Sequence, residues 1–149
     1  MTTVVIRADA FVGLMASCVE VYRKEAFGII FGYKSGKKYM VKEILPFQTA
    51  KRGYTSASLK PSKEKALNEV LACMSKDSII GDYHSHPGEV YDTLSGEDVY
   101  DIVRRKRDYL SLLVSIKLTN RYRKWKSTKN GLTGTLGKYY IKIKAYEFI

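Results

Sequence analysis

The sequence predicts a single layered α/β domain of the mixed α+β kind, because strand-like and helix-like patterns alternate along the chain. At 149 residues, the chain can bury roughly two thirds of its extended surface around one core. Residues 109–118 are almost wholly apolar and include β-branched side chains, which is typical of a strand buried on both faces. We therefore expect one domain, residues 1–149, with this strand near the centre of its sheet.

The first elements are a strand at residues 3–6 and an amphipathic helix that begins at Asp9. Apolar side chains in the helix recur at intervals of three and four, and Asp9 is suited to be its N-cap. The side chains on this apolar face are Phe11, Leu14, Met15, Cys18, Val19 and Tyr22. The helix is expected to end near Arg23 and Lys24, where basic residues are favoured.

The next segment predicts a β-hairpin. Its first arm, residues 26–34, has an apolar centre bracketed by Gly28 and Gly32, which suits a buried strand approached closely by another backbone or by a substrate. A Ser-Gly-Lys turn at residues 35–37 leads into the second arm, residues 38–48.

A second helix is expected after an exposed loop. Residues 48–60 have no sustained period and predict the loop, whereas Pro61 and Ser62 suit the start of a helix. The side chains expected on its buried face are Ala66, Leu67, Val70, Leu71, Cys73 and Met74.

The second half of the chain begins with a strand at residues 78–87, followed by a loop and a third helix at residues 95–107. Residues 119–130 are polar and basic. Residues 137–149 alternate partially between apolar and basic side chains, which predicts a late, outer strand.

The net charge of +11 is concentrated in residues 104–129, which include RRKR at 104–107 and RYRKWK at 121–126. Such a charge attracts nucleic acid or an acidic protein surface, although an ordinary solvated surface explains it equally well. The predicted surface for an anionic partner consists of Arg121, Tyr122, Arg123, Lys124, Trp125 and Lys126. In this surface Tyr122 and Trp125 could stack on bases.

The sequence contains neither a signal-peptide pattern nor an apolar run long enough to span a bilayer. We therefore expect a cytoplasmic protein without a membrane partner. Cys18 and Cys73 both fall in helical patterns and are expected to be small buried thiols in a reducing compartment, not a disulfide and not metal ligands.

The two histidines of the chain, His84 and His86, flank Ser85 in the strand at 78–87. Because side chains alternate along a strand, both imidazoles point to the same face and can chelate one metal ion. Ser95 is suited to be a helix N-cap, which puts Asp98 in the first turn of the helix. Two histidines and an aspartate are a usual ligand set for a catalytic zinc ion that keeps one position open for water.

These motifs resemble those of the JAMM zinc metalloproteases, also called the MPN-plus or JAB family. The resemblance rests on H-S-H-P at residues 84–87, S-x-x-D at 95–98, and a glutamate, Glu25, that precedes the G-x-x-x-G strand. It covers nearly the whole chain and implies a curved mixed β-sheet flanked by helices. It also implies that His84, His86 and Asp98 hold one zinc ion.

Two further roles come from the same resemblance: Glu25 would be the general base, and Ser95 would assist at the oxyanion. Eight residues separate His86 from Ser95, one more than is usual in the family. Glu89 and Asp92 are therefore alternative carboxylate ligands, but Asp98 is preferred because its place at a helix start fixes its direction.

The family implies hydrolysis of an amide or isopeptide bond at the C-terminus of a ubiquitin-like or sulfur-carrier protein. The short chain looks like a stand-alone prokaryotic member. Two alternatives stay open: a zinc amidase acting on another peptide, such as a cell-wall peptide, and a module that binds nucleic acid through its basic surface.

Overall fold

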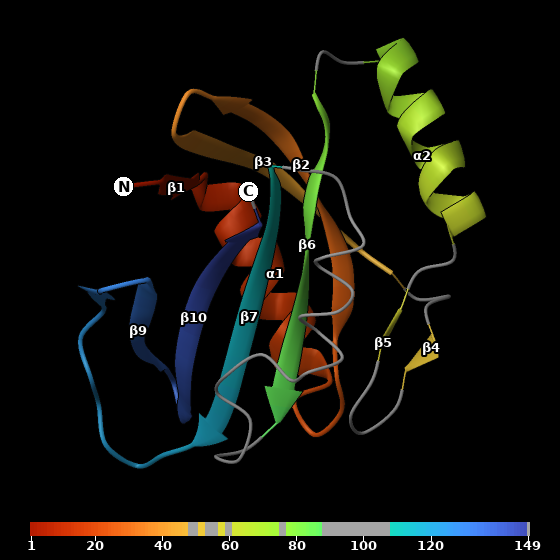
Figure 1. The fold of residues 1–149 in the computed structure, drawn as a ribbon. Coiled ribbons are helices and arrows are strands. Elements are labelled where there is room, and N and C mark those ends of the chain that lie inside the picture. Colours follow the sequence, from red (N-terminus) through yellow and green to blue (C-terminus); the bar gives the residue numbers. More distant parts are fainter. Residues whose placement is uncertain (48–50, 53–56, 59–60, 75–76, 88–107, 149) are drawn as a thin grey trace.

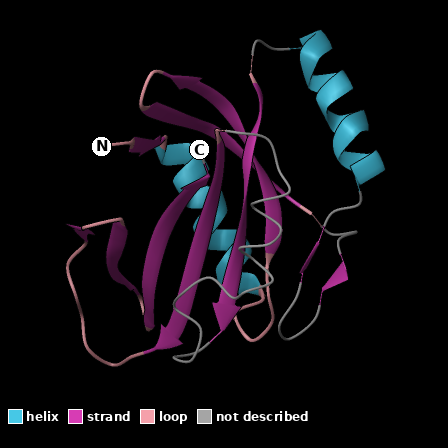
Figure 2. Ribbon diagram, in the orientation of Figure 1, coloured by secondary structure: helices cyan, strands magenta, loops and turns pink. Residues whose placement is uncertain are grey.

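The computed structural model describes residues 1–47, 51–52, 57–58, 61–74, 77–87 and 108–148 (Figure 1). These residues form a large mixed β-sheet, a small second sheet and two helices (Figure 2). The elements are β1 (Thr3–Ile6), α1 (Ala8–Glu20), β2 (Phe27–Ser35), β3 (Lys38–Pro46), β4 (Lys51–Arg52), β5 (Ala57–Ser58), α2 (Pro61–Met74), β6 (Ser78–Pro87), β7 (Tyr109–Leu118), β8 (Lys126–Thr128), β9 (Gly131–Leu136) and β10 (Tyr139–Phe148).

The large sheet has eight strands in the order β1-β3-β2-β6-β7-β10-β9-β8. Two neighbouring pairs, β1–β3 and β6–β7, are parallel, and the other pairs are antiparallel. The expected curved mixed sheet with flanking helices is therefore present. Neither described helix is long and apolar enough to cross a membrane.

Helix α1 lies against one face of the sheet (Figure 1), and the main core consists of side chains packed between them. Leu14 and Cys18 of α1 are fully buried and belong to one cluster with Tyr83, Leu112 and Val114 of the central strands. A second, smaller cluster is built on Phe27 and Ile29 of β2. It includes Leu67 of α2, so this helix contacts a different part of the sheet from α1.

The central position of β7 is confirmed, because it lies between β6 and β10 and its first eight residues are buried. The predicted hairpin is also confirmed: β2 and β3 pair across a turn in which Gly36 has a φ of +58°. A Cβ on Gly32 would lie 1.9 Å from the backbone oxygen of Met40, which is the close backbone approach expected there.

The outer-strand prediction for residues 137–149 is wrong. β10 is an interior strand between β7 and β9, and β8 forms this edge of the sheet. Both β8 and β9 come from segments whose polar and glycine-rich sequence carries little strand signal. The predicted loop at 48–60 likewise contains a small hairpin, β4–β5, whose strands are too short to show alternation.

The helix predictions need two corrections. Asp9 is not the N-cap of α1: Arg7 precedes the helix without a side-chain cap, and Asp9 lies in the first turn, where its Oδ1 accepts the N–H of Ala10 at 3.0 Å. The helix also ends at Glu20, before the predicted Arg23–Lys24.

The predicted buried face of α2 is largely exposed. Met74 and Val70 are 80% and 55% exposed, and Cys73 and Ala66 are also exposed, whereas Leu67 and Leu71 are half-buried. Cys18, in contrast, is buried as expected, and both cysteines are free thiols.

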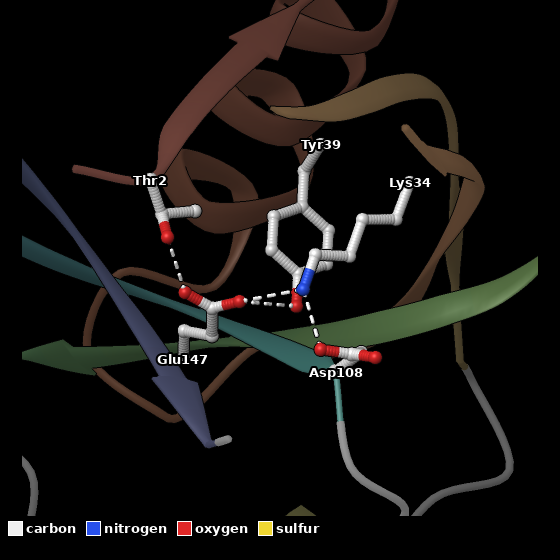
Figure 3. Close-up of polar contacts among 5 residues, drawn as sticks. All are labelled: Thr2, Lys34, Tyr39, Asp108 and Glu147. Carbon is white, nitrogen blue, oxygen red and sulfur yellow. Dashed lines mark hydrogen bonds and ion pairs between the residues drawn. The ribbon is translucent and has the colours of Figure 1, made fainter. Parts of the chain in front are cut away.

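The two ends of the chain meet at one polar cluster, defined by Thr2, Lys34, Tyr39, Asp108 and Glu147 (Figure 3). Glu147 accepts hydrogen bonds from the Thr2 hydroxyl at 2.6 Å, from Nζ of Lys34 at 3.0 Å and from the Tyr39 hydroxyl at 3.0 Å. Lys34 also forms an ion pair with Asp108. This cluster joins the N-terminus, the β2–β3 hairpin and the ends of β7 and β10.

Candidate metal centre

His84 and His86 lie two residues apart on β6, and their rings face each other edge-on with centroids 4.9 Å apart. Both side chains are buried, with 8% and 4% of their surface exposed. The alternation of β6 directs them to the face opposite Tyr83 and Ser85, which pack toward α1. The predicted pairing of the two imidazoles on one face is therefore confirmed.

Glu25 joins the histidine pair from a distant part of the sequence. It immediately precedes Ala26 and β2, whose first residue Phe27 pairs with His84 in the antiparallel β2–β6 ladder. Its side chain is 3% exposed, and its Oε1 lies 3.1 Å from Nε2 of His86. This distance is within hydrogen-bond reach, so the Glu25 carboxylate is placed beside any group that the histidines would hold.

Ser85 fixes this arrangement from the other face of β6. Its backbone N–H donates to the carbonyl of Ala26 at 3.0 Å, and its hydroxyl oxygen accepts the Ala26 N–H at 2.8 Å. Ser85 is 1% exposed and also forms a hydrogen bond with the thiol of Cys18, which lies below it in α1. Glu25 is thus held beside His86 by bonds to the residue between the two histidines.

A second buried acid, Asp82, lies on the histidine face two residues before His84. Its side chain is 7% exposed and accepts hydrogen bonds from the hydroxyls of Ser111 at 2.9 Å and Tyr109 at 3.4 Å. No motif in the sequence marks this residue. Side chains alternate along a strand, so Asp82 lies on the same face of β6 as His84 and His86. This alternation is the sequence signal that could have identified Asp82.

Of the predicted site residues, Ser95 and Asp98 lie outside the described residues, as do the alternative ligands Glu89 and Asp92 and the predicted helix at 95–107. In the described part of the chain, no group of three His, Cys, Asp or Glu side chains surrounds a common metal position. The described part of the predicted centre is therefore His84, His86 and Glu25.

The basic segment 121–126 is divided between the surface and the core. Tyr122 is 80% exposed, and Arg121, Arg123, Lys124 and Lys126 are exposed. Trp125 instead packs edge-on against Phe11 of α1 at 5.3 Å, and a Cβ on Gly134 would lie 2.5 Å from its ring. Trp125 is half-buried and its ring takes part in packing, and its predicted stacking on bases stays a prediction.

No protein-family model and no curated protein matches this sequence. The fold is similar to the solution structure of protein DSY2949 from Desulfitobacterium hafniense, a structural-genomics target, with a TM-score of 0.64 and 17% sequence identity. The match covers 100% of this chain and 92% of that protein. At this identity the likeness establishes a shared fold and carries nothing about activity.

Proposed function

We propose that this protein is a JAMM-like zinc metallohydrolase that cleaves an amide or isopeptide bond at the C-terminus of a ubiquitin-like or sulfur-carrier protein. The observation that carries the proposal is the buried contact between His86 and Glu25 beside His84. The two imidazoles and the carboxylate come from two distant segments of the sequence and lie together, which supports the motif resemblance.

The donor set fits zinc. Two neutral imidazoles are favoured zinc ligands, and Nε2 of His84 is buried in the interior of the site. His84, His86 and, from outside the described residues, Asp98 would hold the ion. Bound zinc would supply a Lewis acid that lowers the pKa of a coordinated water toward about 7.

Glu25 would act as the general base. Its Oε1 lies 3.1 Å from Nε2 of His86, and a cation bound to that nitrogen would leave the carboxylate free to accept a proton from another group. The released carboxylate would then take a proton from the attacking water and pass it to the leaving amine. Its burial keeps bulk water from competing for that proton.

The experiment combines metal analysis with hydrolysis assays. Purified wild-type protein should contain about one equivalent of zinc and should cleave at least one member of a panel of ubiquitin-like fusions until a chelator is added. Glu25→Gln should retain zinc and lose hydrolysis by at least a hundredfold, as expected for a general base. His84→Ala and Asp98→Ala should lose zinc.

Glu43→Gln, an exposed carboxylate on β3, is the matched control and should retain both zinc and hydrolysis. Protein that contains no zinc and gains none on incubation contradicts the proposal. Cleavage by Glu25→Gln at the wild-type rate contradicts the assigned base. If the protein cleaves a cell-wall peptide and none of the ubiquitin-like fusions, the proposed mechanism stands but the proposed substrate is wrong.

A further inference from the structure

A basic hollow of about 520 Å³ opens where β7 ends and β10 begins. Its lining residues are Lys117, Leu118, Thr119, Asn120, Arg123, Lys138 and Tyr140. Among these described residues three are cationic and none is acidic, so they present a positive field to a ligand. Tyr140, one of these lining residues, is 9% exposed.

Several cations converge on the ring of Tyr140. The guanidinium of Arg123 lies 4.8 Å from the ring centroid, and the ammonium groups of Lys117 and Lys142 lie 5.5 Å and 5.8 Å from it. The positive charges gathered beside the ring attract an anion toward the hollow.

The phenol of Tyr140 lies beside these cations and is also hydrogen-bonded within the fold. Its oxygen accepts a hydrogen bond from the buried Thr133 hydroxyl at 2.9 Å. This bond, followed by the charges of Lys142, Arg123 and Lys126, holds the pKa of Tyr140 below its ordinary value, against the opposing effect of burial. Lowering the pKa of a phenol means that negative charge is stabilised at this place.

The hollow lies on the same face of the sheet as the histidine pair. His86 pairs with Ser115 on β7, Lys117 follows two residues later, and Lys117 pairs with Tyr140 on β10. By alternation these side chains share one face, and strand geometry separates the Cα atoms of His86 and Lys117 by roughly 8 Å. A chain bound at the histidines can reach the hollow within a few residues.

We propose that the basic hollow is a specificity subsite that binds a carboxylate side chain of the protein substrate, close in sequence to the bond cleaved at the histidine centre. This inference rests on the proposed function. The substrate class is thereby narrowed to carriers or conjugates with an acidic residue near the scissile bond.

Nucleic acid fits the hollow less well. Sequence-independent binding of single strands uses aromatic faces on which bases stack. The ring of Tyr140 is covered by cations and Trp125 packs against Phe11, so Tyr122 is the exposed aromatic residue of segment 121–126. A compact hollow that contains ammonium and guanidinium groups matches a carboxylate better than a run of bases.

The test measures binding of three labelled probes to the full chain by fluorescence anisotropy. The probes are an oligoglutamate, an oligoglutamine of the same length and an oligothymidylate of matched charge. Wild-type protein should bind oligoglutamate best of the three, and added salt should weaken this binding. The double variant Arg123→Glu/Lys138→Glu should lose affinity for oligoglutamate about tenfold or more.

The matched control is Lys37→Glu/Lys129→Glu, which changes the net charge equally at two exposed turn positions away from the hollow. It should retain nearly the wild-type affinity. If the glutamate substitutions at Arg123 and Lys138 prevent folding, the Arg123→Gln/Lys138→Gln variant gives the same comparison with a smaller effect.

Equal losses in the two charge-reversal variants would overturn the inference, because bulk charge would then explain binding. Equal affinity for oligoglutamine, or tighter binding of oligothymidylate through the same residues, would overturn it as well. None of these measurements requires hydrolysis or zinc. A failure of the subsite is therefore distinguishable from a failure of the proposed function, which metal analysis detects.

Discussion

Ser85 connects the two halves of the candidate metal centre at the scale of a single residue. It carries the backbone between His84 and His86, and it binds both polar backbone groups of Ala26, the neighbour of Glu25. The position of the proposed base therefore depends on the strand that carries the proposed ligands. A loop alone would hold a carboxylate less firmly.

Ser85→Ala should destabilise the fold, because it leaves the N–H of Ala26 without the hydroxyl oxygen that it contacts at 2.8 Å. An unsatisfied buried donor costs about 1–3 kcal/mol, which chemical denaturation measures as a lower free energy of unfolding. Ser127→Ala, on exposed β8, is the control and should change stability by less than about 0.5 kcal/mol. Equal stabilities of the two variants would contradict the structural role of Ser85.

Cys18 and Cys73 should differ sharply in reactivity. Burial raises the pKa of the Cys18 thiol to about 12, although its hydrogen bond with Ser85 works in the opposite direction. At about pH 8 almost no Cys18 thiolate exists, and the thiolate is the reactive form. Mass spectrometry after alkylation of native protein should find the label on exposed Cys73, with Cys18 labelled only after denaturation. Rapid labelling of Cys18 in the native state would contradict its burial.

At the scale of elements, the packing of β6 against β7 depends on the absence of a side chain at Gly81. A Cβ at this position would lie 1.9 Å from the carbonyl oxygen of Leu110 in β7, so the strands would have to separate. Because β6 carries both histidines, such a shift would also disturb the candidate metal centre.

Gly81→Ala should therefore lower the free energy of unfolding by about 1–3 kcal/mol. Gly13→Ala, in the middle of α1, is the matched comparison, because nothing lies within 4 Å of its added Cβ. It should raise stability by about 0.5–1 kcal/mol, since alanine favours a helix. The midpoint of thermal unfolding should fall for Gly81→Ala and rise for Gly13→Ala. Equal shifts of the two midpoints would contradict the close approach of β6 and β7.

At the scale of the whole molecule, the sequence predicted those features that a local pattern specifies. The continuous apolar run of β7 identified the central strand, and the alternation of β6 identified the histidine face. The interior position of β10 was missed because its alternating lysines are typical of an edge strand. Strands β9 and β8, which extend the sheet beyond β10, have weak strand patterns. The order of strands in a sheet depends on which strands pair with one another, and the local periodicity of a sequence does not encode that pairing.

The same limit applies to the candidate site. The contact of Glu25 with His86 followed from a motif resemblance, because the intervening chain contains no periodic signal that joins them. Ser85 and Asp82 were overlooked because their roles depend on bonds to Ala26, Ser111 and Tyr109. The apolar face of α2 was predicted from periodicity, but periodicity does not state how deeply a helix is buried.

The polar cluster in Figure 3 predicts how the stability of the whole fold depends on pH. Burial alone would raise the pKa of Glu147, but hydrogen bonds from Thr2, Lys34 and Tyr39, and the charge of Lys34, hold it below its ordinary value of 4.5. A carboxylate with a lowered pKa stabilises the fold above that ordinary value, and this contribution is lost as the pH falls through the pKa of the folded state.

Glu147→Gln should therefore cost stability at about pH 6, where it removes the charge that binds Lys34, and should cost progressively less toward about pH 3. Thermal unfolding of wild type and variant across this range measures the difference, which should narrow on the acid side. Because Glu147 ties Thr2 to the β2–β3 hairpin and to β10, its protonation should loosen both chain ends together. A difference between the two proteins that stays constant with pH would mean that the lost interaction does not depend on the charge of Glu147.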